Sequence, residues 1–157
     1  MKNILLKKTF LLLLSVTVVL GYVFAQNKSN APKKAITYLN DKVTQSGDIT
    51  VKDFVSLIQS PLWAKDLRDS SFFPVYSFRF TYAERALYED QNGKPMIFTD
   101  YMFYNCKSQL DSAMLKDVKS RVKPGDTVLI EQVQFMNPKI KGSLLMPSSS
   151  LKLVLKK

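Results

Sequence analysis

The side chains that most often carry catalysis are scarce in this sequence. It contains no histidine, which excludes Ser–His–Asp and Cys–His catalysis and removes the commonest ligand of catalytic zinc. Its one cysteine, Cys106, follows an aromatic run and precedes Lys107, and a single lysine neighbour is weak evidence for a reactive thiolate. We therefore expect Cys106 to be a buried structural residue, as free cysteines commonly are.

Carboxylates are the remaining candidates for acid–base chemistry, because a pair of them can hydrolyse a glycosidic bond. The sequence places them in settings typical of solvated surface, and it has no glycine-rich phosphate loop, acidic calcium loop or cysteine cluster. We predict that the protein is not an enzyme and has no catalytic, metal-binding or cofactor-binding residue. We also expect no pair within about 5–10 Å inside a cleft among Glu84, Glu89, Asp90, Asp100 and Glu131.

The elements that position these residues follow a predicted export segment. Residues 1–25 have the order of a secretory signal peptide: basic residues, then an apolar run over 10–25, then small residues at its end. The run is shorter than the roughly 20 residues that span a bilayer. We predict cleavage before Gln26 and export to the periplasm or cell surface, with no stable membrane span. An uncleaved anchor is the alternative.

The composition of the remaining chain predicts one basic domain. The net charge is +10, and three of the lysines lie in the predicted signal peptide. Because the other lysines are scattered, we expect a solvated basic surface, with attraction to an anionic envelope or an acidic partner as the alternative. No nucleic-acid partner is expected. Residues 26–34 are polar and predict a flexible leader, and residues 35–157 predict a single β-rich domain.

Two short helices are predicted from their capping residues and apolar stripes. The first begins after Thr50, with Asp53 in the capping-box position, and Pro61 ends it. Its apolar face holds Phe54, Leu57 and Ile58.

The second helix is expected over residues 109–122. Ser108 and Asp111 repeat the capping-box spacing, which makes Ser108 the predicted N-cap. Its four-residue stripe predicts burial of Met114 and Val118 against a sheet. The stripe consists of Leu110, Ala113, Met114, Val118 and Val122.

Strand patterns dominate the rest. Residues 35–43 are compatible with a short strand or a helix, whereas alternation from Phe72 predicts a half-buried strand. The face of that strand expected in the core, rather than in a carbohydrate platform, consists of Phe72, Tyr76, Phe78, Phe80 and Tyr82.

Three further strands complete the expected sheet. Asp90-Gln91-Asn92-Gly93 predicts a hairpin leading into a strand over 96–104. Residues 127–135 form the next strand, 137–142 a turn, and alternating leucines at 151, 153 and 155 a final strand. An α+β sheet with helices on one side is compatible with this order, but the short strands and hairpin turns favour an antiparallel β-sandwich with two short helices.

The order of these sequence motifs resembles that in the C-terminal domain family of the gliding-motility protein GldM, over about residues 49–157. Phe73-Pro74-Val75 and Ser77-Phe78 precede the capped helix, then come Lys123-Pro124-Gly125-Asp126 with its strand and a leucine-rich strand. Similar modules occur on other Bacteroidetes envelope proteins, including some sensor peptidases. The resemblance implies an immunoglobulin-like β-sandwich that works by protein–protein contact in the periplasm, where the family's domain ends a long dimeric shaft.

The resulting hypothesis is a non-enzymatic interaction module of the cell envelope. Its partners would be envelope proteins, including those of secretion or motility machinery, and a homodimer is an open alternative. The partner-binding residues are not identified, although the closing strand is a candidate edge for pairing with a partner. The rival hypotheses are a small-ligand or glycan-binding module using tyrosines and Trp63, an exported carboxylate enzyme, and a type IX secretion cargo.

Overall fold

The computed structural model describes residues 35–140 and 144–157. The predicted signal peptide 1–25, the leader 26–34 and the last part of the expected turn 137–142 lie outside the described residues. The described chain is mainly β, as predicted, with two short helices. Within it, neither helix is long and apolar enough to cross a membrane.

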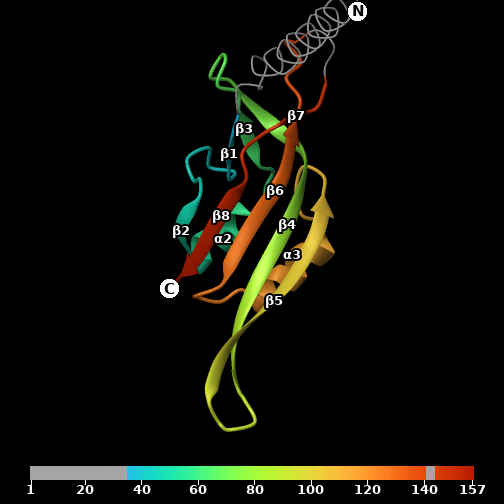
Figure 1. The fold of residues 1–157 in the computed structure, drawn as a ribbon. Helices are drawn as coiled ribbons and strands as arrows, with labels where there is room; N and C mark the ends of the chain where they lie inside the picture. Colours follow the sequence, from blue (N-terminus) through green and yellow to red (C-terminus); the bar gives the residue numbers. More distant parts are fainter. Residues whose placement is uncertain (1–34, 141–143) are drawn as a thin grey trace, which may run out of the picture. The chain divides into compact units, whose positions relative to one another are not determined.

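The strands join in one curled sheet (Figure 1) with the order β1-β3-β4-β6-β8-β2; β5 pairs with β4 and β7 with β6. The predicted strand 127–135 is found with those bounds. The elements, in chain order, are β1 (Ile36–Tyr38), β2 (Gly47–Thr50), α2 (Val51–Leu57), β3 (Trp63–Lys65), β4 (Phe72–Glu89), β5 (Pro95–Cys106), α3 (Ser112–Arg121), β6 (Thr127–Phe135), β7 (Met146–Pro147) and β8 (Leu151–Lys156).

The sheet is mixed rather than purely antiparallel. β2 runs parallel to β8, whereas β1, β3, β4, β5, β6 and β8 pair antiparallel along the rest of the order. The mainly β class is therefore confirmed, and the two separate sheets of an immunoglobulin-like sandwich are not. Alternation along a strand reports which side chains are buried, but the strand order depends on pairing between distant segments.

The core lies between one face of the sheet and the two helices. β4, β6 and β8 each contribute fully buried side chains, and one residue of each helix joins them. These contacts bury enough apolar surface to hold helices that would be too short to persist alone. The central members are Phe54, Phe80, Tyr82, Val118, Val128, Ile130, Leu151, Leu153 and Leu155.

Helix α2 begins as predicted. The Thr50 hydroxyl accepts a hydrogen bond from the Asp53 backbone N–H at 3.0 Å and donates one to the Asp53 carboxylate at 2.7 Å. This cap satisfies a backbone donor that the first turn would leave unpaired. Phe54 is the one fully buried residue within α2, and Ile58 is buried just after it.

Helix α3 starts three residues later than expected. Its N-cap is Asp111, whose carboxylate accepts the Met114 N–H at 2.8 Å, and not Ser108. A carboxylate at the N-cap also suits the positive end of the helix dipole, which explains why Asp111 takes this place. Val118 is fully buried, as predicted, whereas Met114 is only partly buried. Ala113 is exposed and does not widen the stripe.

The predicted core face of the first long strand is wrong at Phe72, which is only half-buried, and at Tyr76, because the buried residues at that end of β4 are Phe73 and Val75. Phe78, Phe80 and Tyr82 are buried, but Tyr76 is exposed. The register between β4 and β6 shifts on both sides of Ser77, which marks a β-bulge. The extra residue moves the buried positions from odd to even numbers while they stay on one face of the sheet.

The closing strand β8 is not an edge, contrary to the expectation that it could pair with a partner. It pairs with β6 on one side and with β2 on the other. Leu151, Leu153 and Leu155 alternate into the core as predicted. The free edges therefore lie elsewhere, and the longest belongs to β5, which pairs only with β4 among the described strands.

Candidate interaction surface on the β4–β5 arm

Strands β4 and β5 extend past the rest of the sheet. The pairing of β4 with β6 stops at Ala83 opposite Thr127, but its pairing with β5 continues to Glu89 opposite Pro95. Residues 84–100 are therefore a two-stranded ribbon, here called the arm, which projects from the body in Figure 1. A two-stranded ribbon is marginally stable by itself, so this one depends on how its base is held.

A compact turn closes the arm, as the sequence predicted. The Asp90 N–H donates to the Lys94 carbonyl at 3.0 Å, and the Asp90 carboxylate accepts the N–H groups of Asn92 and Lys94, each at 2.9 Å. Gly93 has a φ of +73°, a conformation that glycine adopts without a steric penalty. The turn is polar, which sets it apart from the ribbon behind it.

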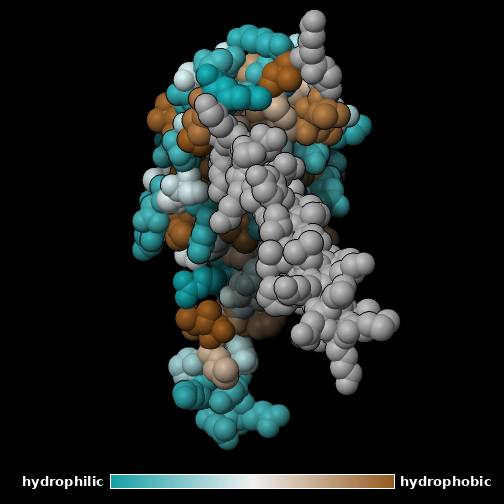
Figure 2. Space-filling model, turned by 45° about the horizontal axis from the view of Figure 1, so that its top comes forward, coloured by the Kyte–Doolittle hydropathy of each residue, from teal (hydrophilic) through white to brown (hydrophobic). Residues whose placement is uncertain are grey.

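Apolar side chains are exposed on both faces of the arm. Leu87 and Ile97, which are cross-strand partners on one face, are 79% and 58% exposed. Phe98 on the other face is 54% exposed and meets Tyr88 edge to face, with ring centroids 6.3 Å apart. Figure 2 shows hydrophobic surface along the arm behind its hydrophilic tip. Contiguous exposed apolar surface of this kind marks sites of association.

A buried carboxylate fixes the base of the arm. Asp126, in the turn between α3 and β6, is fully buried and accepts hydrogen bonds from the Tyr82 hydroxyl, the Arg85 N–H at 2.8 Å and the Lys123 N–H at 3.2 Å. Burial, and then the neighbouring Asp126 carboxylate, raise the pKa of Tyr82, so its phenol stays a donor. Asp126 thus joins β4, where the arm begins, to the α3–β6 turn.

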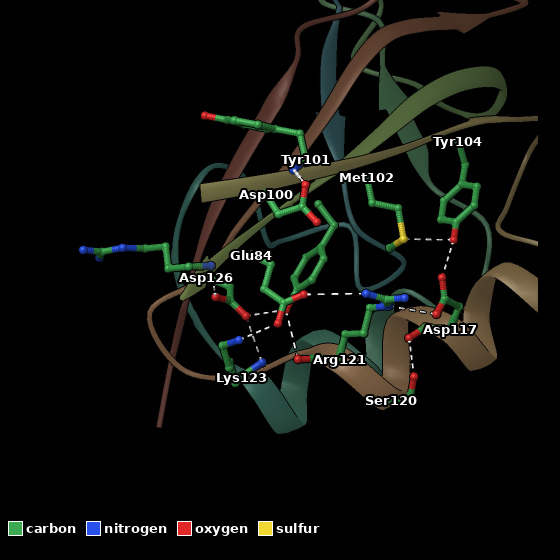
Figure 3. A network of polar contacts seen from close by, with 12 residues as sticks. Glu84, Asp100, Tyr101, Met102, Tyr104, Asp117, Ser120, Arg121, Lys123 and Asp126 are labelled. Atoms are coloured by element: carbon green, nitrogen blue, oxygen red, sulfur yellow. Dashed lines mark hydrogen bonds and ion pairs between the residues drawn. The ribbon is translucent and has the colours of Figure 1, made fainter. Parts of the chain in front are cut away.

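Ion pairs continue this network across the sheet face (Figure 3). Glu84 lies between Lys123 Nζ at 2.6 Å and an Arg121 guanidinium nitrogen at 3.8 Å. Arg121 also contacts Asp117 at 2.9 Å, and Asp117 accepts the Tyr104 hydroxyl at 2.6 Å. That hydrogen bond, and then burial, raise the pKa of Tyr104 to about 12. The network ties the strands at the base of the arm to helix α3.

The other candidate carboxylates do not gather in a described pocket. Register places Glu84 opposite Asp100, but Glu84 is occupied by Lys123, and Asp100 accepts the Tyr101 N–H at 2.9 Å. Glu89 ends β4. Glu131 lies on β6 opposite Arg79. Neither these residues nor Asp90 line the three pockets found beside Pro74, Thr50 and Lys152 in the part of the chain that the structure describes.

Cys106 and Trp63 both have structural surroundings. Cys106 is buried, as expected, and burial raises the pKa of its thiol to about 11, which keeps it protonated at neutral pH. Trp63 is half-buried on β3, and the ammonium group of Lys42 lies 3.9 Å from its ring centroid. A cation over the ring already occupies the surface that a sugar would stack on.

Sequence reasoning predicted the hairpin but missed its extension beyond the sheet as an arm, and it missed the role of Asp126. The signal for the arm is a run of three apolar residues on each strand, 86–88 and 96–98, where a half-buried strand would alternate. For Asp126 the signal is weaker, since an Asp after Pro-Gly is common in exposed turns. Comparison with family models, curated proteins and solved structures finds no match. In the described ranges, no three acidic or cysteine side chains gather in a way that could hold a metal ion.

A second buried carboxylate gives a prediction on acid stability. Asp66 accepts the Arg68 Nε–H at 2.9 Å and the Asn137 side-chain N–H at 3.0 Å, and the Arg68 guanidinium, more than any other group, holds its pKa well below the usual range. Because the folded-state pKa is depressed, its contribution to stability is present at neutral pH and is lost as the pH falls below about 4.

Replacing Asp66 with Asn should lower the free energy of unfolding at pH 7 by about 1–3 kcal/mol. Urea denaturation between about pH 5 and pH 2 should show the native protein losing stability more steeply than Asp66→Asn. Glu89→Gln, at an exposed position at the end of β4 where the carboxylate forms no ion pair within the described residues, is the control and should leave the curve unchanged. If the free energy of unfolding fell equally steeply with pH in the native protein and in Asp66→Asn, the expectation would be contradicted.

Proposed function

We propose that this protein is a non-enzymatic protein–protein interaction module of the cell envelope, exported to the periplasm or cell surface, and that the arm is its main contact surface. One observation carries the proposal: the arm exposes Leu87, Tyr88, Met96, Ile97 and Phe98 on both faces of a ribbon that nothing else in the described chain covers. A partner that covers them would gain apolar burial and would stabilise a marginal hairpin.

The shape of the arm favours a protein partner. Small-molecule sites are concave and lined by a few convergent polar groups, whereas the arm is a projecting ribbon with aromatic and aliphatic side chains. Such side chains are typical anchors of protein interfaces. The resemblance of residues 49–157 to the GldM C-terminal domain supports an envelope protein of secretion or motility machinery as the partner class.

One observation favours ligand binding as a second candidate. A pocket of about 240 Å³ on the open face of the sheet is lined by Tyr101, Arg85 and Lys152, among others. An exposed aromatic ring beside two cations suits an acidic glycan. The arm remains the stronger argument, because its exposed surface is larger and lies on both faces.

Substituting the arm should abolish partner capture. Leu87→Ser, Ile97→Ser and Phe98→Ser, made together and expressed in the native cell, should lower the yield of partner crosslinked in the envelope at least about tenfold, since each anchor contributes on the order of 2 kcal/mol. The readout is quantitative mass spectrometry of captured envelope proteins. Secretion or motility components should be the ones depleted.

The matched control is Val43→Ser with Leu144→Ser, because both side chains are highly exposed and lie outside the arm. It should capture partner at the native level. Far-ultraviolet circular dichroism should show that the arm variant keeps its strands. Equal capture by the arm variant and the control would overturn the proposal.

A further inference from the structure

The free edge of β5 carries little of the protection that sheet edges normally have, because Asp100 is its one charged residue. Its register with β4 is regular over twelve consecutive pairs, Phe78–Glu89 with Pro95–Cys106, and no bulge interrupts it. It contains no lysine or arginine, and its only proline is its first residue. Proteins usually block a long edge with such features, because unpaired backbone groups attract other strands. An unblocked edge therefore indicates a surface that pairs with another strand.

The hydrogen-bond pattern shows which backbone groups face this edge. The Asp90 N–H to Lys94 carbonyl bond makes that pair a hydrogen-bonded one, and such pairs alternate along an antiparallel ribbon. The even-numbered residues of β5 therefore bond to β4, and the odd-numbered residues direct their N–H and C=O groups outward. The Tyr101 N–H fits this assignment, because its acceptor is the Asp100 side chain and not β4.

We propose that β5 binds an extended, acidic segment of the partner protein by strand addition along this edge. The inference rests on the proposed function and specifies how the partner is recognised. Main-chain hydrogen bonds to Ile97, Thr99, Phe103 and Asn105 would provide affinity, since this is how extended peptides join an exposed sheet edge. Tyr101 joins them once Asp100 releases its N–H.

Charge indicates an acidic segment. The Arg79 guanidinium lies 4.9 Å from the Phe103 ring centroid, over the edge strand, and its buried Nε has no hydrogen-bond partner in the described chain. An added strand would lie about 4.8 Å from β5, within reach of that guanidinium. Neither Arg79, Arg85 nor Lys152 forms an ion pair within residues 35–140 and 144–157. The overall charge of +10 favours the same partner.

Asp100 and the net charge disfavour a second copy of this chain as the added strand. Asp100 is near the middle of β5. Antiparallel pairing of two β5 strands with full overlap would therefore place the two Asp100 carboxylates opposite each other or on a diagonal, and like charges so placed are destabilising. Two copies of a strongly basic chain would also repel each other at long range.

The test uses synthetic peptides of about ten residues, the upper end of the usual strand length, with the purified full chain. A peptide alternating Glu and Val should bind in fluorescence anisotropy. The same peptide N-methylated at alternate residues cannot form the ladder and should bind at least tenfold more weakly, as should a Lys–Val peptide. Amide hydrogen exchange should show protection of the odd-numbered residues from 97 to 105.

Two variants complete the test. Arg79→Gln should weaken binding of the Glu–Val peptide about tenfold, while Lys52→Gln, which removes one charge from the exposed side of α2, should not. Asn105→Pro removes an outward N–H without breaking a bond to β4, and should weaken binding as well.

Equal binding of the N-methylated peptide, or protection elsewhere on the sheet, would overturn strand addition and leave the arm proposal standing. A dimer in analytical ultracentrifugation that Asn105→Pro dissociates would overturn the acidic partner in favour of a second copy. If the arm variant lost its partner in cells but still bound the Glu–Val peptide, the arm and the edge would act separately. That result would overturn the link between them.

Discussion

Replacing Asp126 with alanine should lower the free energy of unfolding by about 2–4 kcal/mol, because the partly buried N–H groups of Arg85 and Lys123 lose their acceptor and the Tyr82 hydroxyl keeps only the Arg121 carbonyl, at 3.1 Å. The Tyr82 hydroxyl and the N–H groups of Arg85 and Lys123 all donate to this carboxylate. The Gly125 N–H donates to the Leu155 carbonyl at 2.8 Å, and the Leu155 N–H donates to the Asp126 carbonyl at 2.9 Å, so the turn is also held against β8. Chemical denaturation at neutral pH measures the loss.

Two further variants provide comparisons for Asp126→Ala. Asp126→Asn keeps one acceptor oxygen and should lose less stability than Asp126→Ala. Glu89→Ala removes an exposed carboxylate at the end of β4 and should stay within about 0.5 kcal/mol of the native protein. If Asp126→Ala behaved like Glu89→Ala, the base of the arm would not depend on this network.

Replacing Phe54 with alanine should cost a similar amount, about 3–5 kcal/mol, because the ring is fully buried and its removal leaves a cavity. Helix α2 has only seven residues and cannot persist without this anchor. Its loss should therefore remove the helical signal of α2 as well as lower the denaturation midpoint.

The neighbouring position provides the control. Lys52→Ala changes an exposed residue of the same helix and should leave the midpoint within about 0.5 kcal/mol of the native value. A Phe54→Ala protein with the stability of Lys52→Ala would mean that α2 is not docked through this ring.

Features set by nearby residues could be predicted from the sequence. Thr50 caps α2, Asp90 and Gly93 form the hairpin turn, a run of β-branched and apolar residues marks β6, and alternation defines β8. In each case a local rule is sufficient: a side chain and a backbone group a few residues apart, a strand-forming composition, or a period of two.

Features set by pairing between distant segments could not be predicted from the sequence. The exposure of Tyr76 depends on a bulge opposite β6, and the interior place of β8 depends on β2, about a hundred residues earlier. The choice of Asp111 over Ser108 as N-cap depends on where the chain leaves β5. The arm was predicted as a hairpin, but its isolation follows from where β6 stops.

The parallel pairing of β2 with β8 has a consequence for the order in which the molecule is completed. Ser46, just before β2, bonds to Lys152, 106 positions later. A chain emerging from the ribosome therefore carries β2 as an unpaired strand until residues 151–156 have been made. Contacts between such distant segments form slowly. The β2–β8 pairing therefore cannot form before residue 151 has been made, whereas β4 and β5, which are neighbours along the chain, can pair much earlier.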